Sequence, residues 1–239
     1  DNARPFPRAK TRLYEDGIKT PLIVHAPKII PQPGRTSALA STIDLAPTLL
    51  EIAGIARPTT FQGVSLLPVL RDPNTTVRDY VFAEQNWHNF AAHVRMVRQG
   101  NVVYMRNALP ERPLPGASDT YYTPSADAVK ALRATGQLNA LQTDMFLLPR
   151  PTEELYDLSS DPSQHVNLAK TAQPPEALSR LRAVLDRWTE ETGDTVPTHP
   201  TADNIELTTG KRSNLRRGDP PGAATRAAQI HAPGPVRLR

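Results

Sequence analysis

An acid, an amide and a lysine at the start of the sequence are the residues best suited to chemistry. Asp1 and Asn2 are adjacent, and Lys10 follows eight residues after Asn2. Carboxylate and carboxamide oxygens are the ligands that calcium and magnesium prefer. A lysine ammonium can hold a sulfate or phosphate group and stabilise charge on its oxygens. The three side chains therefore predict an anion site built around a divalent cation.

Two ligands do not complete such a site. Calcium takes about six to eight oxygen ligands, so further carboxylates would have to come from elsewhere. On residue types alone, an Asp-Asn pair at a chain end is more often solvated, and a single lysine usually lies on the surface. The three residues by themselves leave both interpretations open.

The wider stretch around these residues resembles the sulfatase family. Its members carry a metal-binding Asp-Asn followed by Gly, then a Lys-Thr-x-x-Tyr-Glu-x-Gly segment that enters a Pro-Leu-Ile-Val strand. The motif Asp-Asn-x-x-Pro-Phe-Pro most resembles the branch that contains heparan N-sulfatase. One departure is Ala3, where the family has Gly, because a side chain strains a turn that needs positive φ. The matching residues are Asp1, Asn2, Lys10, Thr11, Tyr14, Glu15, Gly17, Pro21, Leu22, Ile23 and Val24.

The resemblance implies a hydrolase that acts on sulfate esters or N-sulfated sugars. It implies that Asp1 and Asn2 bind Ca²⁺ in a site that this chain leaves incomplete, and that Lys10 is catalytic and holds the sulfate of the substrate. A sulfated small molecule or glycan would be the substrate. The resemblance also implies a periplasmic or secreted location for the full-length enzyme.

The family's nucleophile is missing from the sequence. Sulfatases use a formylglycine made from Cys or Ser within Cys/Ser-x-Pro-x-Arg, and the chain has no cysteine and no such motif. The nearest string, Ser160-Asp161-Pro162-Ser163-Gln164, lacks the arginine. We therefore expect a C-terminal fragment, inactive alone, whose partner is the missing N-terminal half of the same enzyme.

A second substrate contact is expected in the loop that follows residues 81–84. These residues form a predicted strand, and the loop after it contains Trp87 and His88. Indole rings stack on sugar faces, and polar side chains bond sugar hydroxyls. A buried Trp beside a satisfied His is an equal alternative from the residues alone. The resemblance favours His88 as a substrate contact, because this loop borders the pocket in similar sulfatases.

The elements that must position these residues follow from periodicity and turn signals. Residues 22–25 are expected to form a short buried strand. Residues 44–54 are expected to form a helix packed on a sheet, with Asp44 as its cap and Gly54 at its end. The apolar face of that helix would comprise Leu45, Leu49, Ile52 and Ala53.

Alternation predicts an antiparallel hairpin from residues 93–98 and 102–107, with Arg95 and Arg98 on its solvated face. Residues 153–158 are predicted to form a strand that ends in an Asp-Pro turn. Two short helices are expected within residues 125–135 and 138–147, as an insertion that lines the pocket. A final helix would begin at Pro174-Pro175, bury Leu178, Leu181, Leu185 and Trp188, and end at Gly193.

These elements predict an α/β fold. We expect the C-terminal part of an alkaline-phosphatase-like sandwich, joined to a small antiparallel sheet subdomain with a C-terminal helix. The expected divisions are residues 1–84 for the α/β part, 85–195 for the sheet subdomain and 196–239 for a Pro/Arg-rich tail.

Composition excludes some classes of function and leaves others open. With 239 residues, 38% of them hydrophobic, the chain can bury a core, and no apolar run approaches the roughly 18 residues that a membrane span needs. Residues 203–239 hold the basic excess, but no aromatic residue separates its tight basic pairs, so a nucleic-acid partner is not expected. A phosphodiesterase or phosphonate hydrolase of the same superfamily, or a non-catalytic carbohydrate-binding remnant, stay as alternatives.

Overall fold

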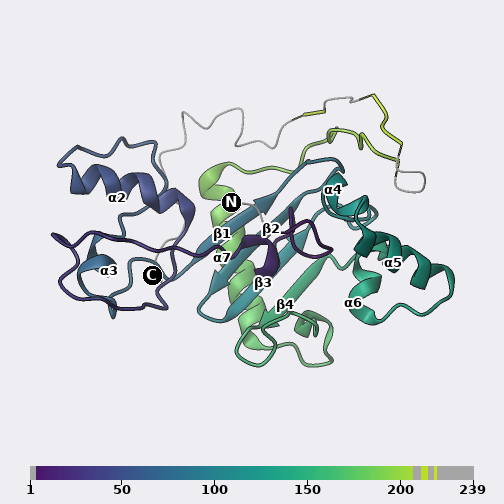
Figure 1. Cartoon of the computed structure of the whole chain (residues 1–239), viewed down its shortest axis with the longest axis horizontal. Helices are drawn as coiled ribbons and strands as arrows, with labels where there is room; N and C mark the ends of the chain where they lie inside the picture. The colour runs from purple at the N-terminus through teal and green to yellow at the C-terminus, as the bar shows by residue number, and fades with distance from the viewer. Residues whose placement is uncertain (1–3, 207–210, 215–217, 220–239) are drawn as a thin grey trace.

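A four-stranded antiparallel sheet forms the centre of the molecule (Figure 1). A computed structural model describes residues 4–206, 211–214 and 218–219. The strands are β1 (Val81–Gln85), β2 (Val94–Gln99), β3 (Val102–Asn107) and β4 (Glu153–Asp157), in the order β1-β2-β3-β4. The predicted hairpin and the strand before the Asp-Pro turn are confirmed.

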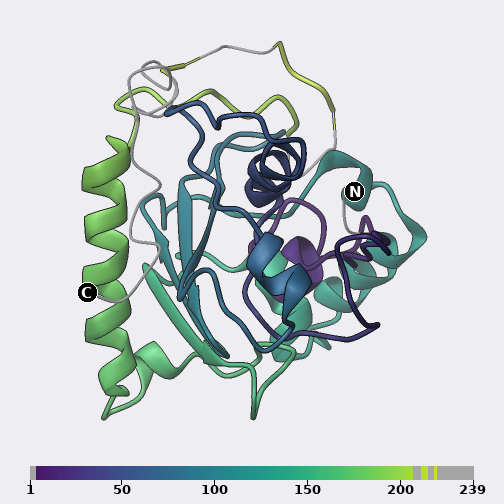
Figure 2. The ribbon, with the colours of Figure 1, turned by 90° about the vertical axis from the view of Figure 1, so that its left-hand side faces the viewer.

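One face of the sheet is covered by α7 (Glu176–Thr192), as Figure 2 shows. Leucines at positions 178, 181 and 185 are buried against Val97, Tyr104 and Leu155 of the sheet. Burying a leucine side chain contributes about 1.5–3 kcal/mol. Trp188 stacks on Phe82, with ring centroids 5.5 Å apart. The helix ends at Gly193, whose φ of 67° suits glycine, so the predicted final helix is confirmed.

The opposite face is covered by the N-terminal segment. This segment includes α1 (Glu15–Ile18), and it buries Leu13 and Tyr14 against β2, β3 and β4. Side chains alternate between the faces of a strand, so Met96 points to this segment while its neighbour Val97 points to α7. The segment that contains Lys10 is thus packed on the sheet.

The remaining helices form two groups, which lie at the left and at the right in the view of Figure 1. One group comprises η1 (Thr42–Asp44), α2 (Leu45–Ile52) and α3 (Leu67–Arg71). The other comprises α4 (Ser118–Tyr121), α5 (Pro124–Ala134), α6 (Ala140–Thr143) and η2 (Asp144–Phe146), which confirms the two predicted helical stretches. A short turn, η3 (Leu168–Lys170), contacts β4.

The strand predicted at residues 22–25 is wrong for this chain. These residues have no regular structure, and the side chain of Ile23 is 91% exposed. The helix at 45–52 is confirmed, but its apolar face does not pack on the sheet, and Leu49 is 66% exposed. A strand requires a hydrogen-bonded neighbour, and none of the described strands lies beside residues 22–25.

Asp44 has a structural role, although it does not cap α2 through its side chain. Its buried carboxylate accepts hydrogen bonds from the backbone N–H groups of Ser41 and Val64, each 2.8 Å long. It also forms an ion pair with Arg78. The carboxylate therefore fastens the α2 region to the chain that leads into β1.

The expected division of the chain after residue 84 stays a prediction, and it falls inside β1. None of the helices in the described part of the chain is both long and apolar enough to cross a membrane.

The exposed apolar side chains give a test of this arrangement. We expect Ile23→Asp and Leu49→Asp to change the free energy of unfolding by no more than about 0.5 kcal/mol, because both side chains already face water. Leu181→Ala, the buried control, should cost about 2–5 kcal/mol. Urea unfolding followed by circular dichroism measures all three. A large loss in Ile23→Asp would show that residues 22–25 are packed in solution.

Candidate functional site

Lys10 lies in the loop that precedes α1 and forms an ion pair with Asp119. The distance from Lys10 Nζ to Asp119 Oδ2 is 2.6 Å. The side chains are 20% and 50% exposed, respectively. The hydrogen bond from Lys10 holds the pKa of Asp119 below its ordinary value. Asp119 belongs to α4, so a helix far along the sequence reaches the lysine.

The structure links the second predicted residue, His88, to the same helix. Asn89 Oδ1 lies 2.8 Å from His88 Nδ1 and accepts a 2.9 Å hydrogen bond from the backbone N–H of Ser118. Ser118 precedes Asp119, the partner of Lys10. Lys10 and Asn89, the neighbour of His88, therefore both contact the first turn of α4. Asp1 and Asn2 lie outside the described residues.

The backbone around Lys10 is strained. Arg8 and Thr11 have φ values of 65° and 67°, a region that costs a non-glycine residue about 1–3 kcal/mol. Gly17 of α1 packs directly on this loop, because a Cβ at Gly17 would overlap the carbonyl oxygens of Ala9 and Arg12. Such conformations persist only where surrounding contacts enforce them.

A buried carboxylate, Asp144, makes ion pairs that help to hold this loop. Arg8 Nη1 and Arg150 Nη2 lie 3.2 and 2.9 Å from its Oδ1, and Arg12 Nη2 lies 3.4 Å from its Oδ2. Arg12 also donates to the Leu114 carbonyl. Burial opposes ionisation of Asp144, but attraction to the three arginines outweighs it and lowers the pKa of Asp144. Lys10 is thus flanked by two arginines that share one anchor.

A tyrosine from the same loop extends this network across the sheet. Tyr14 donates a 2.8 Å hydrogen bond to Glu154 Oε2, and Tyr156 donates to the same oxygen at 2.5 Å. The guanidinium of Arg8 lies 3.7 Å from the centroid of the Tyr14 ring. Burial, with the nearby Glu154 charge, raises the pKa of Tyr14, so the phenol stays a donor. The sequence did not predict this network, because residues 8–14 and residues 144–156 are more than 100 positions apart and no local pattern links them.

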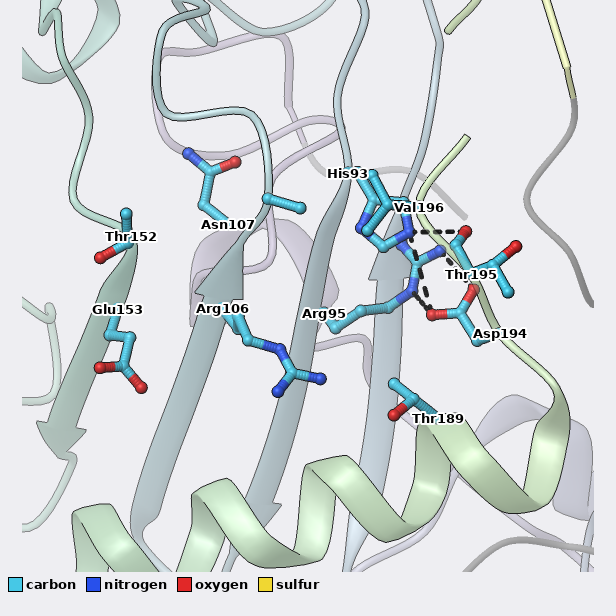
Figure 3. Close-up of a pocket in the computed structure, with 11 residues that line it drawn as sticks. His93, Arg95, Arg106, Asn107, Thr152, Glu153, Thr189, Asp194, Thr195 and Val196 are labelled. Atoms are coloured by element: carbon cyan, nitrogen blue, oxygen red, sulfur yellow. Dashed lines mark hydrogen bonds and ion pairs between the residues drawn. The ribbon is translucent and has the colours of Figure 1, made fainter. Parts of the chain in front are cut away.

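A cavity of about 510 Å³ lies at the α7 face of the sheet (Figure 3). Arg95, Arg106 and Glu153 are register partners on adjacent strands and form a charged row across its floor. Each has an ionic partner: Asp194 for Arg95, Asp186 for Arg106 and Arg182 for Glu153. The cavity is lined by His93, Arg95, Arg106, Asn107, Ala108, Thr152, Glu153, Thr189, Asp194, Thr195 and Val196.

The prediction that Arg95 lies on a solvated face is wrong, since its side chain is 1% exposed. Its Nε and Nη2 lie 2.7 and 2.8 Å from the two oxygens of Asp194, a bidentate pair. Asp194 reaches Arg95 because the chain turns back at Gly193. Burial and the Arg95 charge lower the pKa of neighbouring His93. Arg98, the other arginine, is partly exposed and pairs with Glu15 at 2.7 Å.

The described residues do not provide a metal centre by themselves. No group of three or more His, Cys, Asp or Glu side chains in the described ranges could hold a metal ion. The oxygens around Lys10 and His88 are already bonded to protein donors.

Comparison with known proteins shows which proteins this chain resembles. A sequence model described as "N-sulphoglucosamine sulphohydrolase, C-terminal" matches residues 8–106. The chain is 33% identical over 203 residues to an ulvan-active sulfatase of Formosa agariphila, covering 81% of this chain and 32% of that protein. It is 31% identical over 207 residues to the human N-sulphoglucosamine sulphohydrolase, covering 81% and 41%. The chain belongs to the sulfatase family.

A solved structure has a similar fold. A protein solved in complex with its substrate, D-glucosamine-2-N,6-O-disulfate, superposes with a TM-score of 0.53 at 21% identity, covering 74% of this chain and 29% of that one. The chain spans about a third of the length of the curated sulfatases that it matches. The match at residues 8–106 includes both Lys10 and His88.

The packing of α1 on the Lys10 loop gives a second prediction. Gly17→Ala should destabilise the chain by several kcal/mol or displace residues 9–12, because the new Cβ meets backbone that cannot rotate away. Gly34→Ala is the matched control, since its Cβ would make only ordinary contact with Pro73. Urea unfolding, together with amide NMR shifts of residues 8–12, measures both effects. Equal behaviour of the two variants would contradict the packing.

The Asp144 cluster gives a pH-dependent prediction. At pH 7, Asp144→Asn should lower the free energy of unfolding by about 3–5 kcal/mol, because it leaves buried arginines without their counter-charge. The folded-state pKa of Asp144 lies below its unfolded value, so its stabilisation is present above that unfolded value, about 3.9, and is lost as pH falls through the folded pKa.

The difference between the wild type and Asp144→Asn should therefore shrink below pH 4, as measured by urea unfolding at pH 7 and pH 3. Asp127→Asn, which removes a carboxylate paired with Lys130 at the surface, is the control and should cost less than about 1 kcal/mol. An Asp144→Asn deficit that is the same at both pH values would contradict the role of the ionised carboxylate.

Proposed function

We propose that this chain supplies the C-terminal part of a sulfatase that hydrolyses sulfate esters or N-sulfates of sugars, with Lys10 holding the sulfate. The observation that carries the proposal is the placement of Lys10. Its ammonium sits at the end of a strained loop that two arginines clamp to Asp144, beside the turn that also binds the His88 loop. An ammonium has three N–H donors, and Asp119 engages only one position around it.

The proposed substrate class is a sulfated sugar. The names of matched relatives, an ulvan-active sulfatase and an N-sulphoglucosamine sulphohydrolase, support this class. His88 would contact the sugar, since its ring is exposed and only its Nδ1 lies near a protein oxygen in the contacts described. For the full-length enzyme we propose a periplasmic or secreted location, on the basis of the family resemblance.

Calcium is proposed as the cofactor, with Asp1 and Asn2 as two of its ligands. A carboxylate and a carboxamide oxygen suit a calcium ion, and the remaining ligands would come from residues outside this chain. When bound, the ion would stabilise the oxygens of the sulfate. The part of the reaction that falls to this chain is to hold and orient the sulfate through Lys10.

We also propose that the chain needs the N-terminal half of the enzyme for turnover. Its sequence contains no Cys/Ser-x-Pro-x-Arg motif to form a formylglycine. Its apolar side chains at Ile23 and Leu49 are exposed, which supports a further folded body that covers them. The matched relatives are two to three times as long as this chain, which is consistent with such a body.

The carbohydrate-binding alternative is less well supported. Trp87 donates its Nε1–H to the carbonyl oxygen of Ala202 at 2.8 Å and is half-buried. The indole N–H therefore helps to hold the segment that follows α7.

The function is tested by binding and turnover together. We expect the chain with added calcium to hydrolyse neither an aryl sulfate nor N-sulfated glucosamine, and to bind N-sulfated glucosamine more tightly than glucosamine in calorimetry. Lys10→Gln should remove that preference, whereas Lys130→Gln on α5 should keep it. Robust turnover would contradict the need for the N-terminal half. Equal binding by Lys10→Gln and the wild type would contradict the role of Lys10.

A further inference from the structure

The ion pair between Lys10 and Asp119 places a carboxylate where an incoming sulfate would need to sit. The Asp119 oxygen lies 2.6 Å from the lysine nitrogen, which is the contact that a sulfate oxygen would make. The pair carries no net charge, so Lys10 does not present a free positive charge to a ligand. A sulfate that approached the intact pair would also meet the negative charge of Asp119.

The side chain of Asp119 can leave without disturbing the fold. It is half exposed, and its other described contact is a 3.1 Å hydrogen bond from the backbone N–H of Thr120. The helix itself is fixed, because Thr120 is fully buried and Ser118 is bonded to Asn89. Ion pairs with this exposure contribute little to stability. Rotation of Asp119 into solvent is therefore inexpensive.

The lysine, in contrast, is held in place. The backbone N–H of Lys10 donates to the Arg4 carbonyl, and its carbonyl oxygen lies beside Gly116, just before α4. Arg8 and Arg12 anchor the chain on both sides of it. A ligand that exchanges with Asp119 would thus meet a lysine whose backbone is already fixed.

We propose that Asp119 is a specificity-determining residue that occupies the anion site of Lys10 until a sulfate group displaces it. This proposal rests on the proposed role of Lys10 in holding sulfate. Exchange of one anion for another excludes uncharged sugars, which cannot replace a carboxylate at the ammonium. It also disfavours weakly coordinating anions such as chloride, because they must compete with a carboxylate that is tethered beside the lysine.

The test is a titration of the chain with sodium sulfate, followed by amide NMR shifts of residues 8–12 at ionic strength held constant with sodium chloride. Asp119→Asn should bind sulfate about fivefold more tightly than the wild type, the ratio expected when a partly exposed competing charge is removed. Asp119→Ser is the second variant and carries the same expectation. Asp119→Glu should restore weak binding.

Asp127→Asn is the matched control, because it removes a carboxylate 3.1 Å from Lys130 on the adjacent helix α5. It should leave the sulfate response of residues 8–12 unchanged. Unchanged or weaker sulfate binding in both Asp119→Asn and Asp119→Ser would overturn the proposal. So would equal tightening in Asp127→Asn, which would reflect net charge alone.

Failure of the proposed function would be recognised separately. If Lys10→Gln in the Asp119→Asn background binds sulfate as tightly as Asp119→Asn, then Lys10 does not hold the anion, and the proposed function and this inference fail together. If Lys10→Gln abolishes binding while Asp119→Asn does not improve it, Lys10 keeps its role and only the displacement of Asp119 is refuted.

Discussion

The structure around the candidate site depends on the buried carboxylate of Asp144. It lies within 3.4 Å of the guanidinium groups of Arg8, Arg12 and Arg150, which come from two distant parts of the chain. A buried arginine without a counter-charge destabilises the folded state, so the burial of these arginines depends on Asp144. The strained backbone at Arg8 and Thr11 is one consequence of this requirement. Lys10 lies between Arg8 and Arg12 in the sequence, so the contacts of these two arginines fix its backbone.

The two faces of the sheet have different physical roles. The face toward α1 is apolar at its centre, and it carries the tyrosine and arginine network beneath the Lys10 loop. The face toward α7 is apolar along most of its length but has a charged row at one end, in which Arg95 and Arg106 lie opposite each other. Like charges in register repel, and Asp194 and Asp186 neutralise them. The charges at the cavity are therefore balanced.

Residues 22–55 carry an exposed apolar surface. Leu22 and Ile23 precede α2, and that helix exposes Leu49 and Ile52. In the described part of the chain these side chains have no sheet to pack on. The region stays attached to the rest of the fold through Asp44 and Arg78, which are both buried. Polar contacts hold it in place, while its apolar side chains stay exposed.

The sequence alone determined the elements whose patterns are local. The alternation of 94–99 and 102–107, the apolar spacing of α7 and the glycine after it specify structure over a few residues, and the motif around Lys10 indicated the family. Tertiary structure decided everything that joins distant positions: the pairing of Lys10 with Asp119, the burial of Arg95 by Asp194, and the cluster at Asp144. It also decided that residues 22–25 form no strand, because strand formation depends on a neighbour that local pattern does not supply. From the sequence alone a charged side chain is expected to face water. It can be buried only where the fold brings a counter-charge next to it.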